Sequence, residues 1–203
     1  KIMNDAVPHV VFDGPSASGK STIARLIAKH LQWHFLPSGM IYRFYAYARI
    51  HNLSIDSVSK LEFALTNDSF HVNFQGDDFG DILLADDIAQ EASKLAKLSQ
   101  VRGDLLELQR NYLLAPGMVA EGRDMASVVF PNADLKFYVD ADRHIRAKRR
   151  TKQLNDSGFD ANVRDVEERL KDRDTNDRTR AAAPLTVDPQ SIRLDSGVYT
   201  PDQ

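Results

Sequence analysis

The stretch Gly14-Pro15-Ser16-Ala17-Ser18-Gly19-Lys20-Ser21 decides the fold, because it satisfies the pattern GxxxxGK[ST] in full. An apolar run at residues 7–12 comes shortly before it and is typical of a buried strand. Residues 21–31 follow with apolar side chains at three- and four-residue spacing, which predicts an amphipathic helix. A strand, a glycine-rich loop and a helix in this order predict a loop that binds phosphate.

In such a loop, glycine lets successive backbone N–H groups point at one anion, and the start of the helix adds its positive dipole end. We expect the ammonium group of Lys20 to reach the β- and γ-phosphates of a nucleotide, and the hydroxyl of Ser21 to bind Mg²⁺. The loop alone does not separate a kinase from a GTPase or a motor ATPase. The sequence lacks the Asn-Lys-x-Asp motif with which GTPases read their base, which favours a small-molecule kinase.

Composition narrows the class of protein. A chain of 203 residues that is 42% hydrophobic can bury one sizeable core with a small inserted lobe. Because the sequence has no cysteine, disulfides, thiol catalysis and cysteine-ligated zinc are excluded, and we expect a cytoplasmic protein. Its apolar runs are far shorter than the roughly 18 residues of a membrane span, so no membrane partner is expected.

The net charge of −3 hides an asymmetry along the chain. Residues 52–91 carry nine acids against one lysine, whereas residues 143–180 carry twelve Lys or Arg against eight acids. This separation predicts two lobes, one of which faces an anion. Because the basic segment is interleaved with acids and poor in aromatics, we expect no nucleic-acid partner.

Strands that alternate with helices predict an α/β fold with a parallel sheet. The expected boundaries are a core of residues 1–50 and 115–203, an insertion at 51–114 with α+β character, and a lid at about 146–158. Residues 70–74 alternate apolar with polar, and turn residues separate them from 82–84, so an antiparallel hairpin is expected there. The expected strands are 7–12, 33–36, 70–74, 118–120, 135–139 and 192–194, and the expected helices are 21–31, 41–50, 88–114, 142–154 and 163–174.

Arginines in the second half of the chain could neutralise a transferred phosphoryl group, for which bidentate guanidinium groups are well suited. Arg173, Asp177 and Arg180 fall at i, i+4 and i+7, so they share one face if the helix continues that far. Spacing alone equally allows a solvated helix laced with ion pairs. The candidates are Arg43, Arg123, Arg149, Arg150, Arg173, Arg178 and Arg180.

An ordered set of motifs resembles the cytidylate kinase family over residues 7–196, most weakly at 50–90. The set is Gly14–Thr22, Ser38-Gly39-x-x-Tyr42-Arg43, Gly122-Arg123-Asp124-Met125, Val128-Val129-Phe130-Pro131, Arg173-Asp174-x-x-Asp177-x-x-Arg180 and Ala183-Pro184-Leu185. The resemblance implies a P-loop kinase with a five-stranded parallel sheet flanked by helices, a small α+β insertion that binds the monophosphate, and a short helical lid. It also implies transfer of a phosphoryl group from ATP to CMP or dCMP with Mg²⁺, by an expected monomer.

Carried over position by position, the resemblance implies a role for each motif residue. The catalytic cations would be Lys20, Arg123, Arg173 and Arg180, and Ser21 would bind the metal. ATP would be bound by Gly14, Pro15, Ser16, Ala17, Ser18, Gly19, Lys20, Ser21, Thr22, Arg149 and Arg150. The acceptor would be bound by Ser38, Tyr42, Arg43, Ser93, Arg102, Gly122, Arg123, Asp124, Arg173, Asp177 and Arg180.

Ser93, Arg102 and Asp124 are the residues that the resemblance assigns to the cytosine base, and their chemistry fits. Cytosine offers an N4 amino donor and acceptors at N3 and O2, whereas uracil presents O4 in place of the amino group. A carboxylate and a hydroxyl can accept from N4, and an arginine can donate to the acceptors. We therefore expect UMP to be a poor substrate.

The sequence departs from the family pattern in three places. Pro37 stands where the family usually carries Asp, the insertion is shorter by roughly one hairpin, and Thr200-Pro201-Asp202 resembles only the start of a closing helix. Asp13, Glu121 and Asp124 are the remaining acids near the loop. For Asp13, a plain role as a turn or capping residue is as good an interpretation as a role in the site. Two other functions stay open, namely a P-loop kinase for UMP, AMP or a metabolite, and a nucleotide-sensing module without productive transfer.

Overall fold

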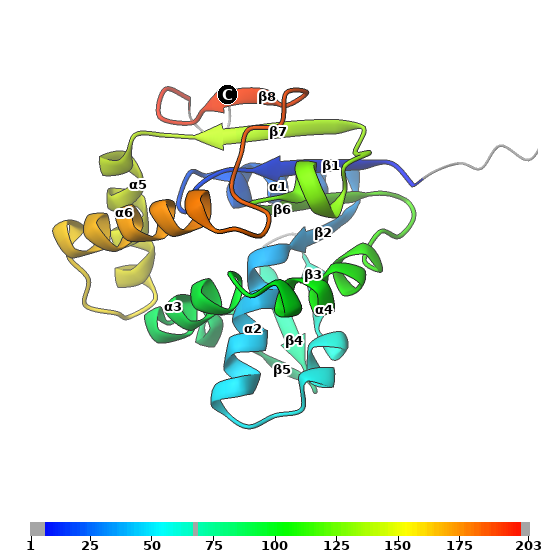
Figure 1. The fold of residues 1–203 in the computed structure, drawn as a ribbon, viewed down its shortest axis with the longest axis horizontal. Coiled ribbons are helices and arrows are strands. Elements are labelled where there is room, and N and C mark those ends of the chain that lie inside the picture. The colour runs from blue at the N-terminus through cyan, green and yellow to red at the C-terminus, as the bar shows by residue number, and fades with distance from the viewer. Residues whose placement is uncertain (1–6, 67–68, 200–203) are drawn as a thin grey trace, which may run out of the picture.

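Five parallel strands form the central sheet of the protein (Figure 1). The computed structural model describes residues 7–66 and 69–199. The strands β2 (His34–Pro37), β6 (Met118–Gly122), β1 (His9–Asp13), β7 (Leu135–Asp140) and β8 (Ile192–Asp195) lie side by side in that order, and each pair is parallel. The predicted sheet is thereby confirmed, while the helix start predicted at residues 200–202 lies outside the described residues.

Helices cover both faces of this sheet, because successive side chains of a strand point to opposite sides. Val10 and Phe12 of β1 pack with Ala24 and Ala28 of α1 (Lys20–Leu31). Val11, between them, belongs to the larger core on the opposite face. That core also contains the apolar face of α2 (Ser38–Ile50). The predicted α/β architecture of a sheet flanked by helices is therefore confirmed.

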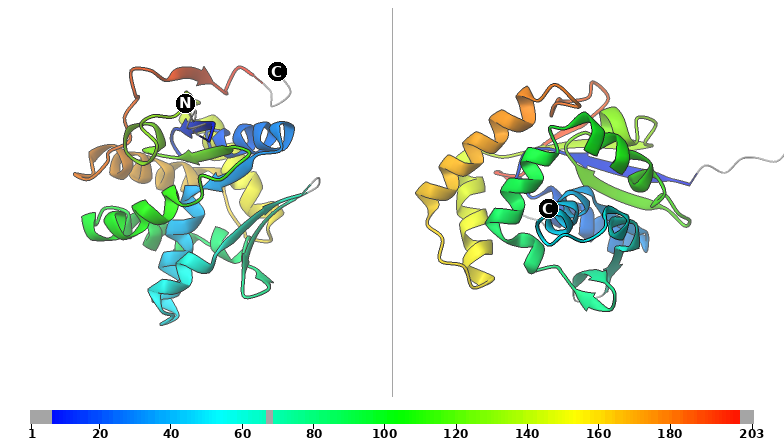
Figure 2. Two further views of the ribbon diagram at one scale, coloured as in Figure 1. Left: turned by 90° about the vertical axis from the view of Figure 1, so that its right-hand side faces the viewer. Right: turned by 60° about the horizontal axis from the view of Figure 1, so that its bottom comes forward.

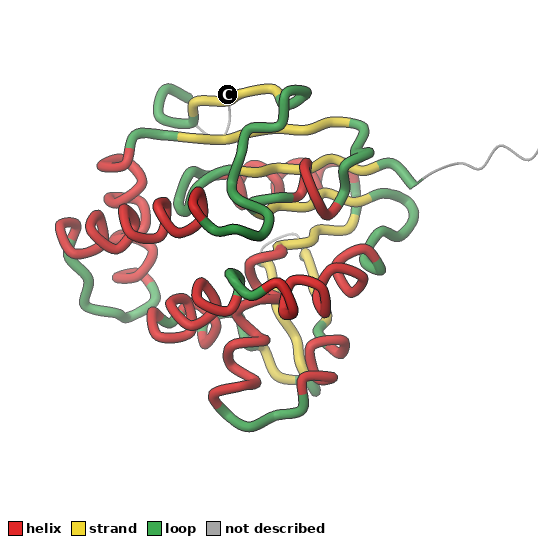
Figure 3. Tube along the Cα trace, viewed as in Figure 1, coloured by secondary structure: helices red, strands yellow, loops and turns green. Residues whose placement is uncertain are grey.

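The chain between β2 and β6 builds a second, antiparallel sheet and two further helices around α2 (Figures 2 and 3). The strands β3 (Glu62–Leu65), β4 (Phe70–Phe74) and β5 (Asp77–Asp78) lie in sequence order. The helices α3 (Asp86–Leu95) and α4 (Ser99–Arg110) and the 3-10 turns Ile55–Lys60 and Ile82–Leu84 complete this part. A π-helical turn, Met125–Val129, follows β6.

Helices α5 (Arg143–Asp156) and α6 (Val163–Thr179) lie beyond the carboxyl ends of the strands, at the left of Figure 1. They share a small core of their own, made of Ala147, Leu154, Val166 and Leu170. Helix α6 continues five residues past its predicted end, so it carries both Arg173 and Asp177 and is capped by Arg180. The helix is therefore long enough for Arg173, Asp177 and Arg180 to lie on one face.

Two predicted elements were wrong. The partner of β4 in the hairpin is β5 and not residues 82–84, because Gly80 N–H donates to the Asp78 carboxylate at 2.8 Å and turns the chain before Ile82. Leu83 is then fully buried within a 3-10 turn. The helix predicted over 88–114 is two helices, since residues 96–98 leave helical geometry and Leu98 is extended.

Candidate active site

A cleft of about 590 Å³ opens beside the phosphate-binding loop and collects most of the predicted site residues. The loop, the start of α2, the end of β6, and helices α3 to α6 all contribute to its walls. Four of the predicted or candidate residues, Gly14, Pro15, Ser18 and Arg178, do not line it. Those that do are Ser16, Ala17, Gly19, Lys20, Ser21, Thr22, Ser38, Tyr42, Arg43, Ser93, Arg102, Gly122, Arg123, Asp124, Arg149, Arg150, Arg173, Asp177 and Arg180.

The loop depends on glycine at two positions. A Cβ on Gly14 would lie 2.0 Å from the carbonyl oxygen of Val139 on β7, so only glycine allows the loop to pass this close to the sheet. Gly19 has a φ of +86° and caps α1 without a side-chain hydrogen bond. The first N–H groups of α1 therefore have no capping side chain and face the cleft that Ser21 and Thr22 line.

Lys20 is folded back onto the loop. Its ammonium group donates to the carbonyl oxygen of Pro15 at 3.0 Å and lies 3.7 Å from the Glu121 carboxylate. Burial, and then the nearby Arg123, lower the pKa of Lys20 to about 7, while Glu121 opposes this shift. An anion in the cleft would restore its charge.

Several arginines converge on the same space. Arg123 donates to the Asp177 carboxylate at 2.9 Å and to the Ser16 hydroxyl at 3.3 Å. Burial and then Arg123 lower the pKa of Arg173 to about 10, and the buried Nε of Arg173 has no hydrogen-bond partner. Burial, followed by Arg173, also lowers the pKa of Arg43. Cations that disfavour one another's charge in a cleft indicate a site for a polyanion.

A second polar group lies at the other end of the cleft, around Asp124. Its carboxylate pairs with Arg102 and lies 3.5 Å from the guanidinium of Arg180. Burial raises the pKa of Asp124, and the two arginines oppose the rise. The Arg102 guanidinium also lies over the ring of Tyr42, 5.8 Å from its centroid. This arrangement can read a planar polar group by hydrogen bonds and stacking.

Arg149 and Arg150 are neighbours on α5 but point to different parts of the protein. Arg149 donates to the hydroxyl of Ser196 at 2.9 Å and to its carbonyl oxygen at 2.6 Å, beside Gly19 of the loop. Arg150 donates to the carbonyl oxygen of Leu84, at 3.1 Å, between β5 and α3. Of these two arginines, Arg149 is the one that lies against Gly19 of the phosphate-binding loop in this conformation.

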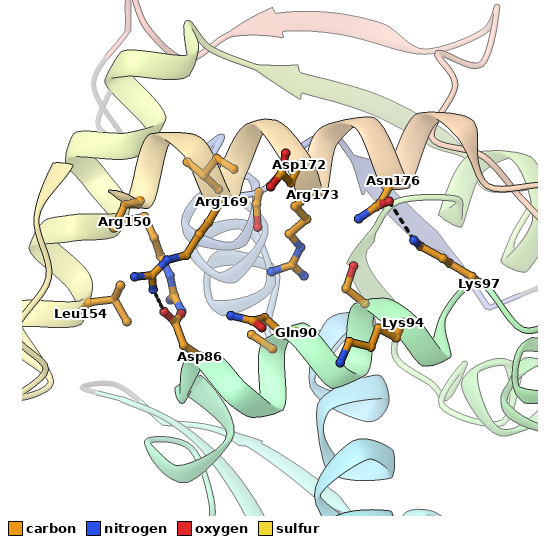
Figure 4. Close-up of a pocket in the computed structure, with 15 residues that line it drawn as sticks. Asp86, Gln90, Lys94, Lys97, Arg150, Leu154, Arg169, Asp172, Arg173 and Asn176 are labelled. Atoms are coloured by element: carbon orange, nitrogen blue, oxygen red, sulfur yellow. Dashed lines mark hydrogen bonds and ion pairs between the residues drawn. The ribbon is translucent and has the colours of Figure 1, made fainter. Parts of the chain in front are cut away.

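An adjoining pocket of about 320 Å³ separates α3 from α6, with Arg173 pointing into it from α6 (Figure 4). The two helices touch through ion pairs and hydrogen bonds across this gap. Asp86 at the start of α3 pairs with Arg169 and lies 4.0 Å from Arg150. Lys97 donates to Asn176 at 2.8 Å at the other end.

Sequence reasoning missed three residues that support the site. Gln109 accepts a hydrogen bond from Ser38 at 2.7 Å, Ser196 holds Arg149, and Arg146 pairs with Asp174 at 2.6 Å while also donating to the carbonyl oxygen of Ser16. The spacing of Arg102, Leu105 and Gln109 on one helical face was the available signal for Gln109.

Asp13 acts as a cap. Its buried carboxylate accepts the N–H groups of Met125 and Ala126 at 2.9 and 2.8 Å, although burial raises its pKa to about 7. It thereby fixes the turn that follows Asp124.

Within residues 7–66 and 69–199, no group of three His, Asp or Glu side chains is placed to hold a metal ion. The helices of this part of the chain are also too short or too polar to cross a membrane.

Comparison with known proteins gives matches among solved structures and many relatives by sequence. A crystal structure of TT1252 from Thermus thermophilus resembles the fold with a TM-score of 0.45 and 16% identity, covering 87% of this chain and 85% of that one. Two curated relatives are named cytidylate kinase. The one from Aeromonas salmonicida is 38% identical over 99% of this chain and 92% of its own length, and the one from Nitrosococcus oceani is 39% identical over 96% and 91%. The family model described as cytidylate kinase matches residues 10–203, and the chain therefore belongs to the cytidylate kinase family.

Proposed function

We propose that the protein transfers the γ-phosphoryl group of ATP to CMP or dCMP, which gives ADP and CDP or dCDP. The observation that carries this proposal is that one cleft joins the phosphate-binding loop, with Lys20, to the Arg102–Asp124 pair. Arg123 interacts electrostatically with both Lys20 and Asp124, and Arg173 interacts with Arg123. A donor polyphosphate and the phosphate of an acceptor nucleotide would meet among these cations.

In the proposed reaction, an oxygen of the acceptor phosphate attacks the γ-phosphorus, and the bond from that phosphorus to the β,γ-bridging oxygen breaks. The attacking oxygen is already anionic, so no side chain has to remove a proton. Lys20, Arg123, Arg173 and Arg180 hold the phosphates in line and offset the negative charge that spreads over their oxygens. We propose in addition that Arg43 binds the acceptor phosphate, and that Asp177 helps to hold the phosphate and ribose of the acceptor.

The reaction is expected to need Mg²⁺, which when bound would neutralise part of the charge on the donor phosphates. The hydroxyl of Ser21, at the first turn of α1, lines the cleft where it can be a ligand. Dedicated carboxylate cages are not needed, because Mg²⁺ in nucleotide sites keeps water and phosphate ligands. Pro37 also lines the cleft, at the position where the family usually carries Asp, so we propose that Ser21 and the phosphates are the principal ligands.

We further propose that residues 51–114 form the acceptor-binding insertion and residues 146–158 the lid. Arg102 and Ser93 come from the first of these segments, and Arg149 and Arg150 from the second. We also propose that the working unit is a monomer, because the proposed donor and acceptor residues line one cleft of a single chain.

The test is ADP release from ATP and Mg²⁺ with CMP, dCMP, UMP, AMP and GMP as separate acceptors. We expect fast turnover only with CMP and dCMP. Turnover confined to another monophosphate would keep the kinase and reject the cytosine assignment of Asp124. ATP binding without turnover of any acceptor would instead support the nucleotide-sensing alternative.

A further inference from the structure

Gln109 is 1% exposed, and both ends of its amide are hydrogen-bonded. The amide nitrogen donates to the carbonyl oxygen of Leu105 at 3.0 Å. The amide oxygen accepts from the hydroxyl of Ser38 at 2.7 Å. Because a backbone carbonyl can only accept, the nitrogen must face Leu105 and the oxygen must face Ser38. The orientation of this amide is thus determined by its surroundings.

The direction of the Ser38 hydrogen bond follows from this orientation. A serine hydroxyl has one proton and two lone pairs, and the oxygen of Gln109 can take only the proton. Once its proton is donated to Gln109, the Ser38 hydroxyl has only its lone pairs available for any other partner. Since Ser38 lines the cleft, it presents an acceptor there and not a donor. A ligand group that meets Ser38 must itself carry an N–H or O–H.

Ser38 and the group around Asp124 line the same cleft, and side chains of helices α2 and α4 connect them. Ser38 and Tyr42 are one turn apart on α2, and Gln109 and Arg102 lie two turns apart on one face of α4. Ser38 and Tyr42 are both hydrogen-bonded to Gln109, and the Arg102 guanidinium lies over the Tyr42 ring. The Asp124 carboxylate, which pairs with Arg102, is a second acceptor in the same wall of the cleft.

We propose that Gln109 is a positioning residue that sets the base specificity of the acceptor site by holding Ser38 as a hydrogen-bond acceptor. This inference rests on the proposed function. An exocyclic amino group fits the acceptor that Ser38 presents, whereas a carbonyl oxygen at the same place meets a lone pair and stays unpaired. Gln109 itself never touches the nucleotide. It excludes oxo bases by denying Ser38 the freedom to turn its proton toward the cleft.

The test compares kcat/KM for CMP and UMP in the wild type and in Gln109→Met, which has a similar volume and no hydrogen-bonding amide. Without its acceptor, the Ser38 hydroxyl can donate to O4 of uracil. We expect the UMP:CMP ratio of kcat/KM to rise about tenfold, since an unpaired buried polar group is what the wild type imposes on UMP. A change in protein stability alone would leave this ratio where it was.

Ser38→Ala and the double variant decide whether Gln109 acts through Ser38. We expect Ser38→Ala to narrow the discrimination against UMP, and Gln109→Met to add nothing to the ratio once the hydroxyl is gone. A ratio unchanged in Gln109→Met or in Ser38→Ala would overturn the proposal, and so would an equal change with and without Ser38. If Gln109→Met does not fold, an unchanged UMP:CMP ratio in Ser38→Ala still overturns the proposal.

Val101→Ala is the matched control, because Val101 is 3% exposed on the same helix and its truncation loosens α4 without removing a hydrogen bond. Its UMP:CMP ratio should equal that of the wild type. Failure of the proposed function is seen separately, in the wild type. A wild-type enzyme that prefers AMP to GMP would reject the cytosine assignment. The preference for an amino group over an oxo group would then be measured as the AMP:GMP ratio of kcat/KM in the same variants. Wild-type protein that turns over no monophosphate would reject both.

Discussion

Lys20 is a cation that the protein holds away from water, with 4% of its surface exposed. Its pKa of about 7 means that at pH 8 most of the ligand-free molecules carry a neutral amine at this position. A polyphosphate that binds against it favours the charged form and raises the pKa. Nucleotide binding at pH 8 is therefore coupled to proton uptake by Lys20.

We predict that ATP binding at pH 8 takes up close to one more proton in the wild type than in Lys20→Met. Calorimetric titrations in two buffers of different ionisation enthalpy measure this number. The difference should shrink as the pH falls toward 6, because Lys20 is then protonated before the ligand arrives. Equal proton uptake by the two proteins at pH 8 would contradict the assignment of the phosphate contact to Lys20.

At this residue scale, the sequence predicted which side chains gather in the cleft but did not predict the residues that hold them in place. The side chains that would meet the ligand, such as Lys20 and Asp124, lie in short motifs whose spacing reflects the ligand. Gln109 and Ser196 act on those side chains from elements far away in the sequence, 71 and 47 residues from Ser38 and Arg149. Such partners are fixed by tertiary packing, which local patterns do not encode.

At the scale of elements, helices α5 and α6 are joined by a buried ion pair. The guanidinium of Arg146 meets the Asp174 carboxylate with two hydrogen bonds, at 2.6 and 3.2 Å, and both side chains are about 5% exposed or less. Arg146 also donates to the carbonyl oxygen of Ser16 at 3.2 Å. The pair thus ties the helical arm to the phosphate-binding loop.

We predict that Arg146→Met lowers the free energy of unfolding by about 3 kcal/mol, because it leaves the Asp174 carboxylate buried without a counter-charge. The double variant Arg146→Met/Asp174→Leu should lose clearly less than the two single variants added together. Urea unfolding of the four proteins measures this coupling. Additive losses would mean that the two side chains stabilise the arm independently.

Elements were predicted well where periodicity decided them and poorly where packing did. The parallel strands are short apolar runs bounded by turn residues, and β1, β6 and β7 were found within two residues of their ends. The break between α3 and α4 has neither proline nor glycine to announce it. Strand β3 was missed because its four residues show no clean alternation and are placed by pairing with β4.

At the scale of the whole molecule, the parallel sheet explains why distant motifs meet. The carboxyl ends of β1, β2 and β6 lie at one edge, and they lead into the phosphate-binding loop, Ser38 and Arg123 respectively. Ligands of open α/β sheets bind at this edge. Helix α3 and the α5–α6 arm then face each other and touch through exposed pairs such as Asp86–Arg169, which are worth little energy.

The cluster of cations in this cleft makes the ligand-free protein less stable than its fold allows. Arg173 is the clearest case, because its Nε is buried without a partner, and burial together with Arg123 lowers its pKa. The folded state thus disfavours a charge that the unfolded chain accommodates in water. A bound polyphosphate would offset the unfavourable free energy of this buried charge. Because the cation is needed to bind the polyphosphate, the ligand-free protein retains the loss of stability.

We therefore predict that Arg173→Met raises the unfolding free energy of the ligand-free protein by about 1 kcal/mol while turnover is severely reduced. The wild type should gain about 2.7 kcal/mol at an ATP concentration one hundred times its dissociation constant, and the same ATP concentration should stabilise Arg173→Met less. Thermal and urea unfolding with and without ATP give both quantities. Asp172→Ala, an exposed neighbour on α6, is the control for the helix itself. A ligand-free Arg173→Met protein less stable than the wild type would mean that Arg173 supports the fold, and that its electrostatic attraction to Asp177 outweighs its repulsion by Arg123.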